Sequence, residues 1–270
     1  MDTFEYDGIP LPHAGFVRNA ARVLRKDERI VGIAVAGSLV ESRADEFSDV
    51  DLVIAIEPLS LEKVLGDREA IAKSLGNLAA AFTGEHVGEP RLLICLYDDP
   101  VLHVDLKFVP IAEATPVVDN PVVVWDRDGR MESVLRQRKG SYPAPDTQWL
   151  EDRFWVWVHY LAGKIARGEL FEAIEGLSFL RVTVLAPLGL MRLGLAATGV
   201  RRLEDNAPEL AKELAATLAR HDRESLWNAL ESAISIYRGF RDEFAPEIIL
   251  RDKAEIVALR TVTELRSNDN

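Results

Sequence analysis

The chain has 270 residues, of which 48% are hydrophobic and 28% are charged, and this composition favours a folded protein with two domains over a disordered chain or a single small one. The formal net charge of −12 argues against nucleic acid as a partner, because affinity for phosphate backbones comes largely from lysine and arginine. No stretch approaches the roughly 18 to 20 uninterrupted apolar residues of a membrane span, and the N-terminus lacks the basic start of a secretory signal, so we expect no membrane partner and a cytoplasmic location.

The first half of the chain alternates helix and strand patterns. Apolar residues recur every three or four positions over 13–26, which predicts a helix. Apolar, partly β-branched runs predict strands at 30–36 and 50–56. The Leu-, Ala-, Lys- and Glu-rich segment 61–82 indicates one long helix, or two shorter ones broken near Gly76. Further strands are expected at 91–97, 102–109 and 122–125.

The second half of the chain is helical in character. Past Pro143 the β-branched runs give way to helical periodicity, so we place a domain boundary between 1–143 and 144–270. Helices are expected at 146–166, 169–184, 204–220, 223–244 and 251–265, and Pro187 should interrupt the chain after the second of them. The predicted fold class is α+β, with a mixed β-sheet and flanking helices followed by an all-α helical bundle.

The most informative motif is Gly37-Ser38, followed after ten residues by Asp49-Val50-Asp51. Side chains alternate along a strand, so Asp49 and Asp51 point to the same side while Val50 enters the core. Two carboxylates so placed repel each other unless a cation lies between them. Magnesium is the natural cation, since it accepts one or two carboxylates together with phosphate oxygens. Taken alone, the two aspartates could equally be solvent-facing residues of an amphipathic strand.

A third carboxylate, Asp105, stands in the middle of the predicted strand 102–109, between Val104 and Leu106. If this strand lies beside the one that carries Asp51, the carboxylates converge and could hold two Mg²⁺ ions. His103 would face the same side as Asp105, either as a neighbour of the metal ligands or as a structural histidine.

The Gly37-Ser38 pair suits a phosphate-binding turn. Glycine after a strand permits a positive φ and a close approach of the backbone, and the adjacent serine can offer its N–H and its hydroxyl to phosphate oxygens. Gly-Ser after a strand is a weak signal by itself, and it becomes specific only together with Asp49, Asp51 and Asp105.

Residues 36–52 resemble the motif of the nucleotidyltransferase superfamily related to DNA polymerase β, namely Gly-Gly or Gly-Ser, a spacer, then Asp-hydrophobic-Asp or Glu. A sheet domain followed by a helical domain looks like the bacterial aminoglycoside and lincosamide nucleotidyltransferases. The motif covers about the first half of the chain, and the second half is similar only in being helical.

The resemblance implies an enzyme that uses ATP or another nucleoside triphosphate. It also implies a carboxylate base in the helical domain, for which the candidates are Glu172, then Glu169 and Glu175. Lys164 could reach a phosphate, and Arg43 in the motif loop is either a triphosphate contact or a solvated charge.

The function predicted from the sequence is therefore Mg²⁺-dependent transfer of a nucleoside monophosphate, AMP from ATP, to a hydroxyl of a small molecule resembling an aminoglycoside or lincosamide antibiotic. The catalytic residues would be Asp49, Asp51, Asp105 and Glu172, and the protein would be a monomer or homodimer. Two alternatives stay open: attachment of AMP to a protein, as in toxin-antitoxin modules, and a non-catalytic nucleotide-binding regulator.

Overall fold

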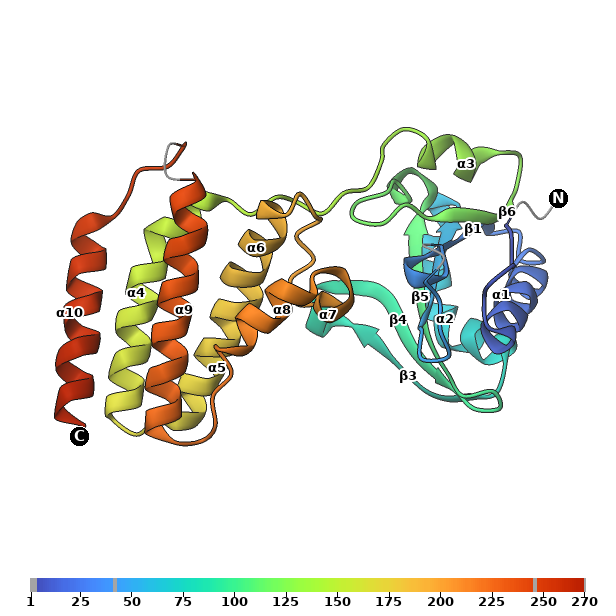
Figure 1. The fold of residues 1–270 in the computed structure, drawn as a ribbon. Helices are drawn as coiled ribbons and strands as arrows, with labels where there is room; N and C mark the ends of the chain where they lie inside the picture. The colour runs from blue at the N-terminus through green and yellow to red at the C-terminus, as the bar shows by residue number, and fades with distance from the viewer. Residues whose placement is uncertain (1–3, 41–42, 245–246, 270) are drawn as a thin grey trace. The chain divides into compact units, whose positions relative to one another are not determined.

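The chain forms two compact units, Met1–Ser141 and Tyr142–Asn270 (Figure 1). The computed structural model describes residues 4–40, 43–244 and 247–269. The first unit contains a mixed sheet with flanking helices, and the second is helical, which confirms the predicted α+β class. The boundary between the units lies two residues before the predicted one.

The sheet of the first unit has six strands in the order β3-β4-β5-β2-β1-β6. The strands are β1 (Ile30–Ala36), β2 (Val50–Ile56), β3 (Leu78–Gly84), β4 (Glu89–Tyr97), β5 (Leu102–Pro110) and β6 (Val122–Asp126). Strands β2 and β5 pair in parallel at the centre, whereas the other neighbours pair antiparallel. Buried residues alternate with more exposed ones along the first half of both central strands, as expected where one face of the sheet is more fully covered than the other.

Helices α1 (Leu11–Leu24) and α2 (Leu61–Leu75) pack on one face of this sheet, where Val17 and Val64 join the same buried cluster as Ile54. On the other face, Met131 of the short helix α3 (Arg130–Leu135) packs in a smaller cluster. Alternate residues of β2 and β5 therefore face the α1 and α2 layer, and the remaining ones face the less covered side.

One element differs from its prediction. Residues 78–84 form strand β3, not the end of a helix, and helix α2 ends at Leu75, directly before Gly76. The residues Leu78-Ala79-Ala80-Ala81 favour a helix by propensity, but β3 pairs with β4 along most of its length, with Ala81 opposite Cys95. Backbone pairing to a neighbouring strand outweighs a weak local preference. The short helix α3 was not predicted either.

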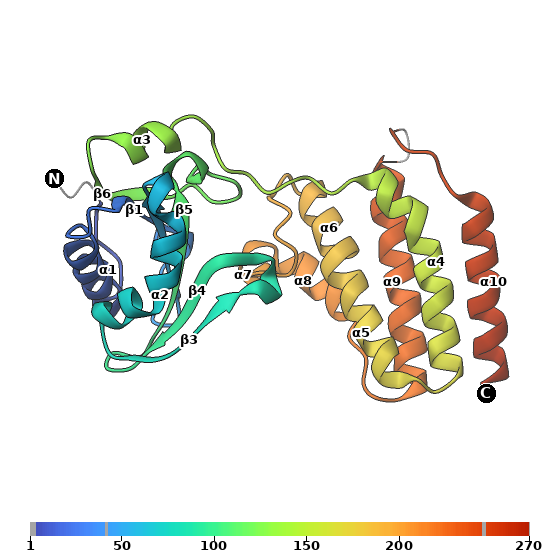
Figure 2. The same cartoon turned by 180° about the vertical axis from the view of Figure 1, so that it is seen from behind.

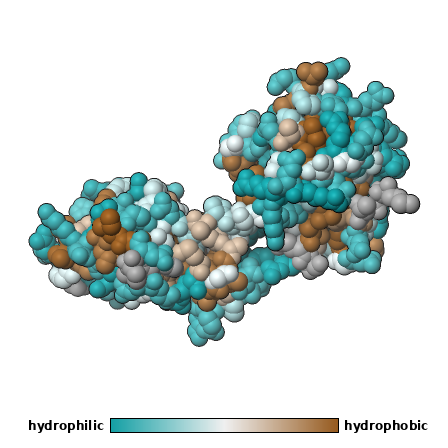
Figure 3. Space-filling view, turned by 90° about the horizontal axis from the view of Figure 1, so that it is seen from above, coloured by the Kyte–Doolittle hydropathy of each residue, from teal (hydrophilic) through white to brown (hydrophobic). Residues whose placement is uncertain are grey.

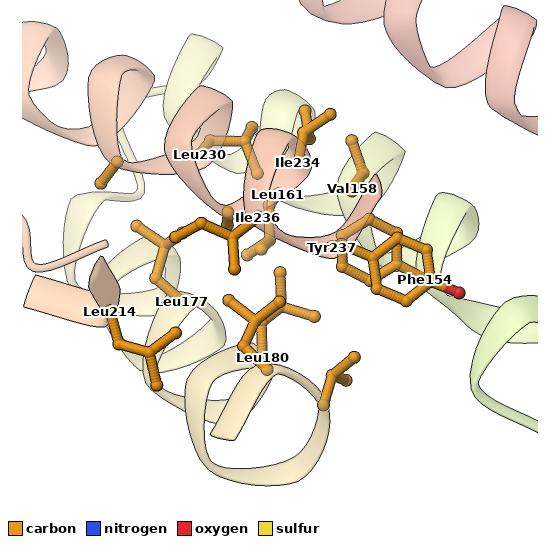
Figure 4. Close-up of a cluster of buried hydrophobic side chains, with 14 of the residues drawn as sticks. Phe154, Val158, Leu161, Leu177, Leu180, Leu214, Leu230, Ile234, Ile236 and Tyr237 are labelled. Atoms are coloured by element: carbon orange, nitrogen blue, oxygen red, sulfur yellow. The ribbon is translucent and has the colours of Figure 1, made fainter. Parts of the chain in front are cut away.

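The second unit packs its helices around one apolar core. They are α4 (Thr147–Ala166), α5 (Leu170–Leu180), α6 (Ala186–Arg192), α7 (Leu203–Asn206), α8 (Pro208–Ala215), α9 (Arg223–Phe244) and α10 (Asp252–Asn268). Helix α4 lies beside both α9 and α10 (Figure 2). Phe154 of α4 stacks on Tyr237 of α9 with ring centroids 3.6 Å apart, and Leu177 and Leu180 of α5 point into the same cluster (Figure 4).

The predicted interruption at Pro187 is wrong, because the helical path continues through it into α6. A π-helical turn, Arg181–Leu185, precedes the proline. Proline has no N–H for the regular helical bond and its ring crowds the preceding turn, so a wider turn is a way to admit it. By contrast, the predicted helix 204–220 is split by Pro208 into α7 and α8 and ends at Ala215.

The helical run Leu170–Arg192 is, by length and composition alone, apolar enough to cross a membrane. Its buried residues, among them Leu177, Leu180 and Val184, lie in the core cluster of the second unit, and core helices of folded domains pass the same test. On the face of the molecule drawn in Figure 3, apolar side chains form patches within a largely hydrophilic surface.

A fully buried carboxylate joins three helices of the second unit. Glu151 on α4 is 0% exposed. It accepts hydrogen bonds from the Tyr237 hydroxyl at 2.6 Å, from the Trp155 indole at 3.2 Å and from the Arg251 backbone N–H at 2.8 Å. The Arg241 guanidinium lies 3.9 Å away and pairs with Glu255 of α10 at 2.5 Å. Buried charge is tolerated here because it is hydrogen-bonded and paired.

We therefore expect Glu151→Ala to destabilise the second unit by about 3 kcal/mol, because it leaves Arg241 and the Tyr237 hydroxyl buried with fewer partners. Urea unfolding followed by tryptophan fluorescence measures this, since four of the five tryptophans lie in that unit. Glu264→Gln, at an exposed position of α10, is the control and should change stability by less than about 0.5 kcal/mol. Equal effects of the two substitutions would contradict the role given to Glu151.

Candidate functional site

Two carboxylates stand side by side at the centre of the sheet. Asp51 of β2 is directly opposite Asp105 of β5 in the parallel ladder. Their chain neighbours, such as Leu52 and Val104, are buried against the helix layer, so both carboxylates face the other side of the sheet. The sequence motif and the later strand aspartate are thus brought together.

Asp49 belongs to the same cluster but lies just outside the ladder, one residue before β2. The imidazole of His103 stands between it and Asp105, with Nδ1 3.7 Å from Asp49 Oδ1 and Nε2 3.2 Å from Asp105 Oδ1. Asp49 is 52% exposed and Asp105 only 26%. Burial raises the pKa of Asp105, His103 opposes this shift, and the nearby Asp49 charge adds to it. Burial is therefore the main electrostatic cost of placing the Asp105 carboxylate here, and the Asp49 charge adds a smaller one.

The turn after β1 touches this cluster directly. Gly37 has a φ of +66°, and a Cβ atom at this position would lie 2.2 Å from Asp51 Oδ2. Only glycine can hold this conformation at this distance from the carboxylate. Ser38 follows in the same short 3₁₀ turn, and its carbonyl accepts the Arg43 backbone N–H at 3.4 Å. The predicted phosphate-binding turn, separated from Asp49 by ten residues in the sequence, therefore lies against Asp51 in space.

The donor set fits a hard divalent cation, since carboxylate oxygens beside a glycine-lined backbone turn are ligands that Mg²⁺ accepts. Within residues 4–40, 43–244 and 247–269, no group of three or more His, Cys, Asp and Glu side chains is placed so that it could hold a metal ion as it stands. The roles of Asp49, Asp51 and Asp105 as metal ligands stay a prediction.

A cavity of about 270 Å³ opens on the same face of the sheet, with Asp51 and Asp105 in its lining. Lys107, two residues beyond Asp105 on the same face, also lines it and pairs with Glu89 at 3.3 Å. Contact with Arg91 lowers the pKa of Glu89 to about 2, so this carboxylate is ionised at neutral pH. Lys107 was given no role from the sequence, although its spacing of two from Asp105 was the signal that could have found it.

One wall of the cavity is formed by residues 113–121. The Asn120 side chain accepts the Gly140 N–H at 2.8 Å, and its amide donates to the Gly140 carbonyl at 3.3 Å. Ser141 N–H donates to the Val117 carbonyl at 3.1 Å. The wall is thus fastened to the last residues of the first unit. Sequence periodicity could not predict this wall, because residues 113–121 form no regular strand or α-helix.

Glu172 and Lys164 lie in the second unit and contact each other. Lys164 Nζ is 2.8 Å from Glu172 and 2.6 Å from Glu169, and the Tyr160 hydroxyl donates to Glu172. These contacts, Lys164 first and Tyr160 second, lower the pKa of Glu172 to about 2. Glu175 is exposed. The structure thus joins the predicted base and the predicted phosphate ligand to each other, and their functional roles stay predictions.

The sequence model of a family described as streptomycin adenylyltransferase matches residues 16–196, well over half of the chain. The chain belongs to this family. The match includes the Gly37 turn, the three aspartates, Lys164 and Glu172. The predicted membership of the nucleotidyltransferase superfamily is thereby confirmed, and the protein is an adenylyltransferase-type enzyme.

Solved structures give more distant matches. An aminoglycoside 6-adenyltransferase from Bacillus subtilis aligns over 90% of this chain and 95% of its own, with 14% identity and a TM-score of 0.42. A nucleotidyltransferase-like protein from Exiguobacterium sibiricum aligns over 83% and 74%, with 10% identity and a TM-score of 0.35. The STING-associated CdnE c-di-GMP synthase from Capnocytophaga granulosa aligns over 88% and 85%, with 11% identity and a TM-score of 0.30. No curated protein matches the chain. The assignment rests on the family match.

Gly37→Ala is expected to displace the Asp51 carboxylate and to reduce nucleotidyl transfer by at least about tenfold, because the new Cβ would overlap Asp51 Oδ2. Gly88→Ala is the matched control, since Gly88 also has a positive φ, +76°, but a Cβ at that position would meet no atom within 4 Å. Both variants should lose about 1–2 kcal/mol of stability from backbone strain, while only Gly37→Ala should lose activity in a pyrophosphate-release assay. A similar activity for both would show that contact with Asp51 is immaterial.

Proposed function

We propose that this enzyme transfers AMP from ATP, in the presence of Mg²⁺, to a hydroxyl of a cationic aminoglycoside such as streptomycin. The observation that carries the proposal is the juxtaposition of Asp51 and Asp105 directly against the Gly37 turn. The family described as streptomycin adenylyltransferase supports the choice of nucleotide and acceptor.

The charge of the cavity supports a cationic acceptor. Among its described lining residues are four carboxylates, Asp51, Asp105, Glu113 and Asp119, against one lysine, Lys107. Lys107 is paired with Glu89, and Glu113 with Arg91. The excess negative charge attracts ammonium or guanidinium groups as well as a metal ion. The net charge of −12 acts in the same direction at longer range.

In the proposed reaction, Asp49, Asp51 and Asp105 would hold Mg²⁺, which supplies neutralisation of the phosphate charge and activation of the acceptor oxygen. The backbone and hydroxyl of Gly37-Ser38 would orient the triphosphate. The acceptor hydroxyl oxygen forms a bond to the α-phosphorus, the bond to the bridging oxygen breaks, and pyrophosphate leaves. The hydroxyl proton passes to a carboxylate, for which we propose Glu172.

Asp51→Asn should abolish streptomycin-dependent pyrophosphate release from MgATP, by about three orders of magnitude, because it removes a charged metal ligand. Asp98→Asn, in the exposed turn between β4 and β5, is the control and should retain full activity. The assay includes other aminoglycosides, a lincosamide and the proteins of a cell lysate as acceptors. AMP attached to a lysate protein alone would indicate a protein acceptor. MgATP binding without any turnover would indicate a regulator. Either outcome would contradict the proposal.

Glu172→Gln should lower kcat by about a hundredfold with little change in KM for ATP, since the amide cannot accept the proton. Glu175→Gln, one turn further along the same helix at an exposed position, should leave kcat unchanged. Steady-state kinetics with saturating acceptor separates them. Equal kcat values for the two variants would remove Glu172 from the mechanism.

A further inference from the structure

The first turn of α1 contains a buried histidine with one hydrogen bond. His13 is 2% exposed, and its Nε2 lies 2.7 Å from the carbonyl oxygen of Ser48. Because a carbonyl only accepts, the imidazole must donate through Nε2 in this bond. His13 Nδ1 has no hydrogen-bond partner in the described part of the chain. The one hydrogen bond that the imidazole makes among the described residues is therefore to Ser48, the residue that directly precedes Asp49.

The segment that His13 contacts is a self-contained turn. Ser48 Oγ donates to Asp45 Oδ1 at 2.9 Å and accepts the Asp45 N–H at 3.0 Å, while Phe47 N–H donates to Asp45 Oδ1 at 3.0 Å. Phe47 is 84% exposed, so it does not anchor the turn in the core. The His13 bond ties this closed turn to helix α1, and hence to the layer that supports the sheet.

Asp49 depends on this turn more than the other two aspartates do. Asp51 and Asp105 are fixed as opposite residues of the β2–β5 ladder, whose first pair is Val50 with Val104. Asp49 precedes that pair, so no ladder bond sets its position. In the chain, Asp49 is followed by β2 and preceded by Ser48, whose carbonyl accepts the hydrogen bond from His13.

We propose that His13 is a positioning residue that clamps the 45–48 turn and thereby directs the Asp49 carboxylate toward His103 and Asp105. An apolar side chain at this position would leave the buried Ser48 carbonyl without its partner, and the turn would move to regain one from water. The consequence for nucleotide binding rests on the proposed function, whereas the clamp itself does not.

The test compares His13→Leu with His13→Gln and Val17→Ala. The glutamine amide can donate from nearly the same place as Nε2, so it should restore the bond. Val17 is fully buried on the same helix, and Val17→Ala provides a loss of core packing without touching the turn. Ser48→Ala removes the two hydrogen bonds of the Ser48 hydroxyl to Asp45 within the turn. It replaces His13→Leu in the test if that variant does not fold.

Amide hydrogen exchange of residues 45–49 in the nucleotide-free protein is the first readout. We expect exchange about tenfold faster in His13→Leu and Ser48→Ala, and unchanged in His13→Gln and Val17→Ala, in line with the loss of one buried hydrogen bond. Calorimetric titration with MgATP is the second, with Kd raised about tenfold in His13→Leu and restored in His13→Gln.

Exchange that rises equally in His13→Leu and Val17→Ala would overturn the clamp and make His13 an ordinary core residue. Faster exchange with an unchanged Kd for MgATP would overturn its positioning of Asp49. A wild-type protein that binds no MgATP, yet shows the expected contrast in exchange, would refute the proposed function and leave the clamp of the turn supported.

Discussion

Parallel pairing of β2 with β5, which sets Asp51 opposite Asp105, is the interaction on which the candidate site of the first unit depends. Parallel pairing of β2 and β5 makes the two residues opposite neighbours, and the buried cluster on the far side of the sheet fixes that register. Slipping the register by one residue would turn Asp51 into the apolar core. Apolar packing on the helix side thus keeps two acidic side chains beside each other on the opposite face, and a cation bound between two carboxylates so placed would be favoured.

The Gly37 turn and the loop that leads to Asp49 supply the remaining parts of the candidate site. The turn reaches the carboxylate of Asp51 because position 37 has no side chain. Asp49 lies beyond the ladder and depends on the packing of the 45–48 turn against α1. A strand, a tight turn and a helix therefore each place one part of the site. The second unit contains a separate Lys164–Glu172 pair, in which contact with Lys164 lowers the pKa of Glu172.

Most strands of the first unit and the residues of the motif could be predicted from the sequence. The central strands are apolar runs bounded by turn residues, and Asp49 and Asp51 are two residues apart, which is the period of a strand. The pairing of β2 with β5 was only a conditional inference, since register is decided by contacts between segments about fifty residues apart. Strand β3 was missed because its alanines favour a helix until β4 is present to pair with them. The helical path through Pro187 was missed because a π turn depends on packing that no local pattern records. The cavity wall at 113–121 and the role of His13 were likewise hidden, since both depend on hydrogen bonds between residues about twenty or more positions apart.

If the aspartate cluster binds a divalent cation together with the nucleotide, Mn²⁺ can take the place of Mg²⁺ there as a paramagnetic substitute. Electron paramagnetic resonance would measure Mn²⁺ binding in the presence of ATP for the wild-type protein and for Asp105→Asn. We expect protein-bound Mn²⁺–ATP in the wild type and a loss of affinity of at least about tenfold in the variant, since one charged ligand of a shared site is removed. Equal binding of Mn²⁺–ATP by the two proteins would contradict it.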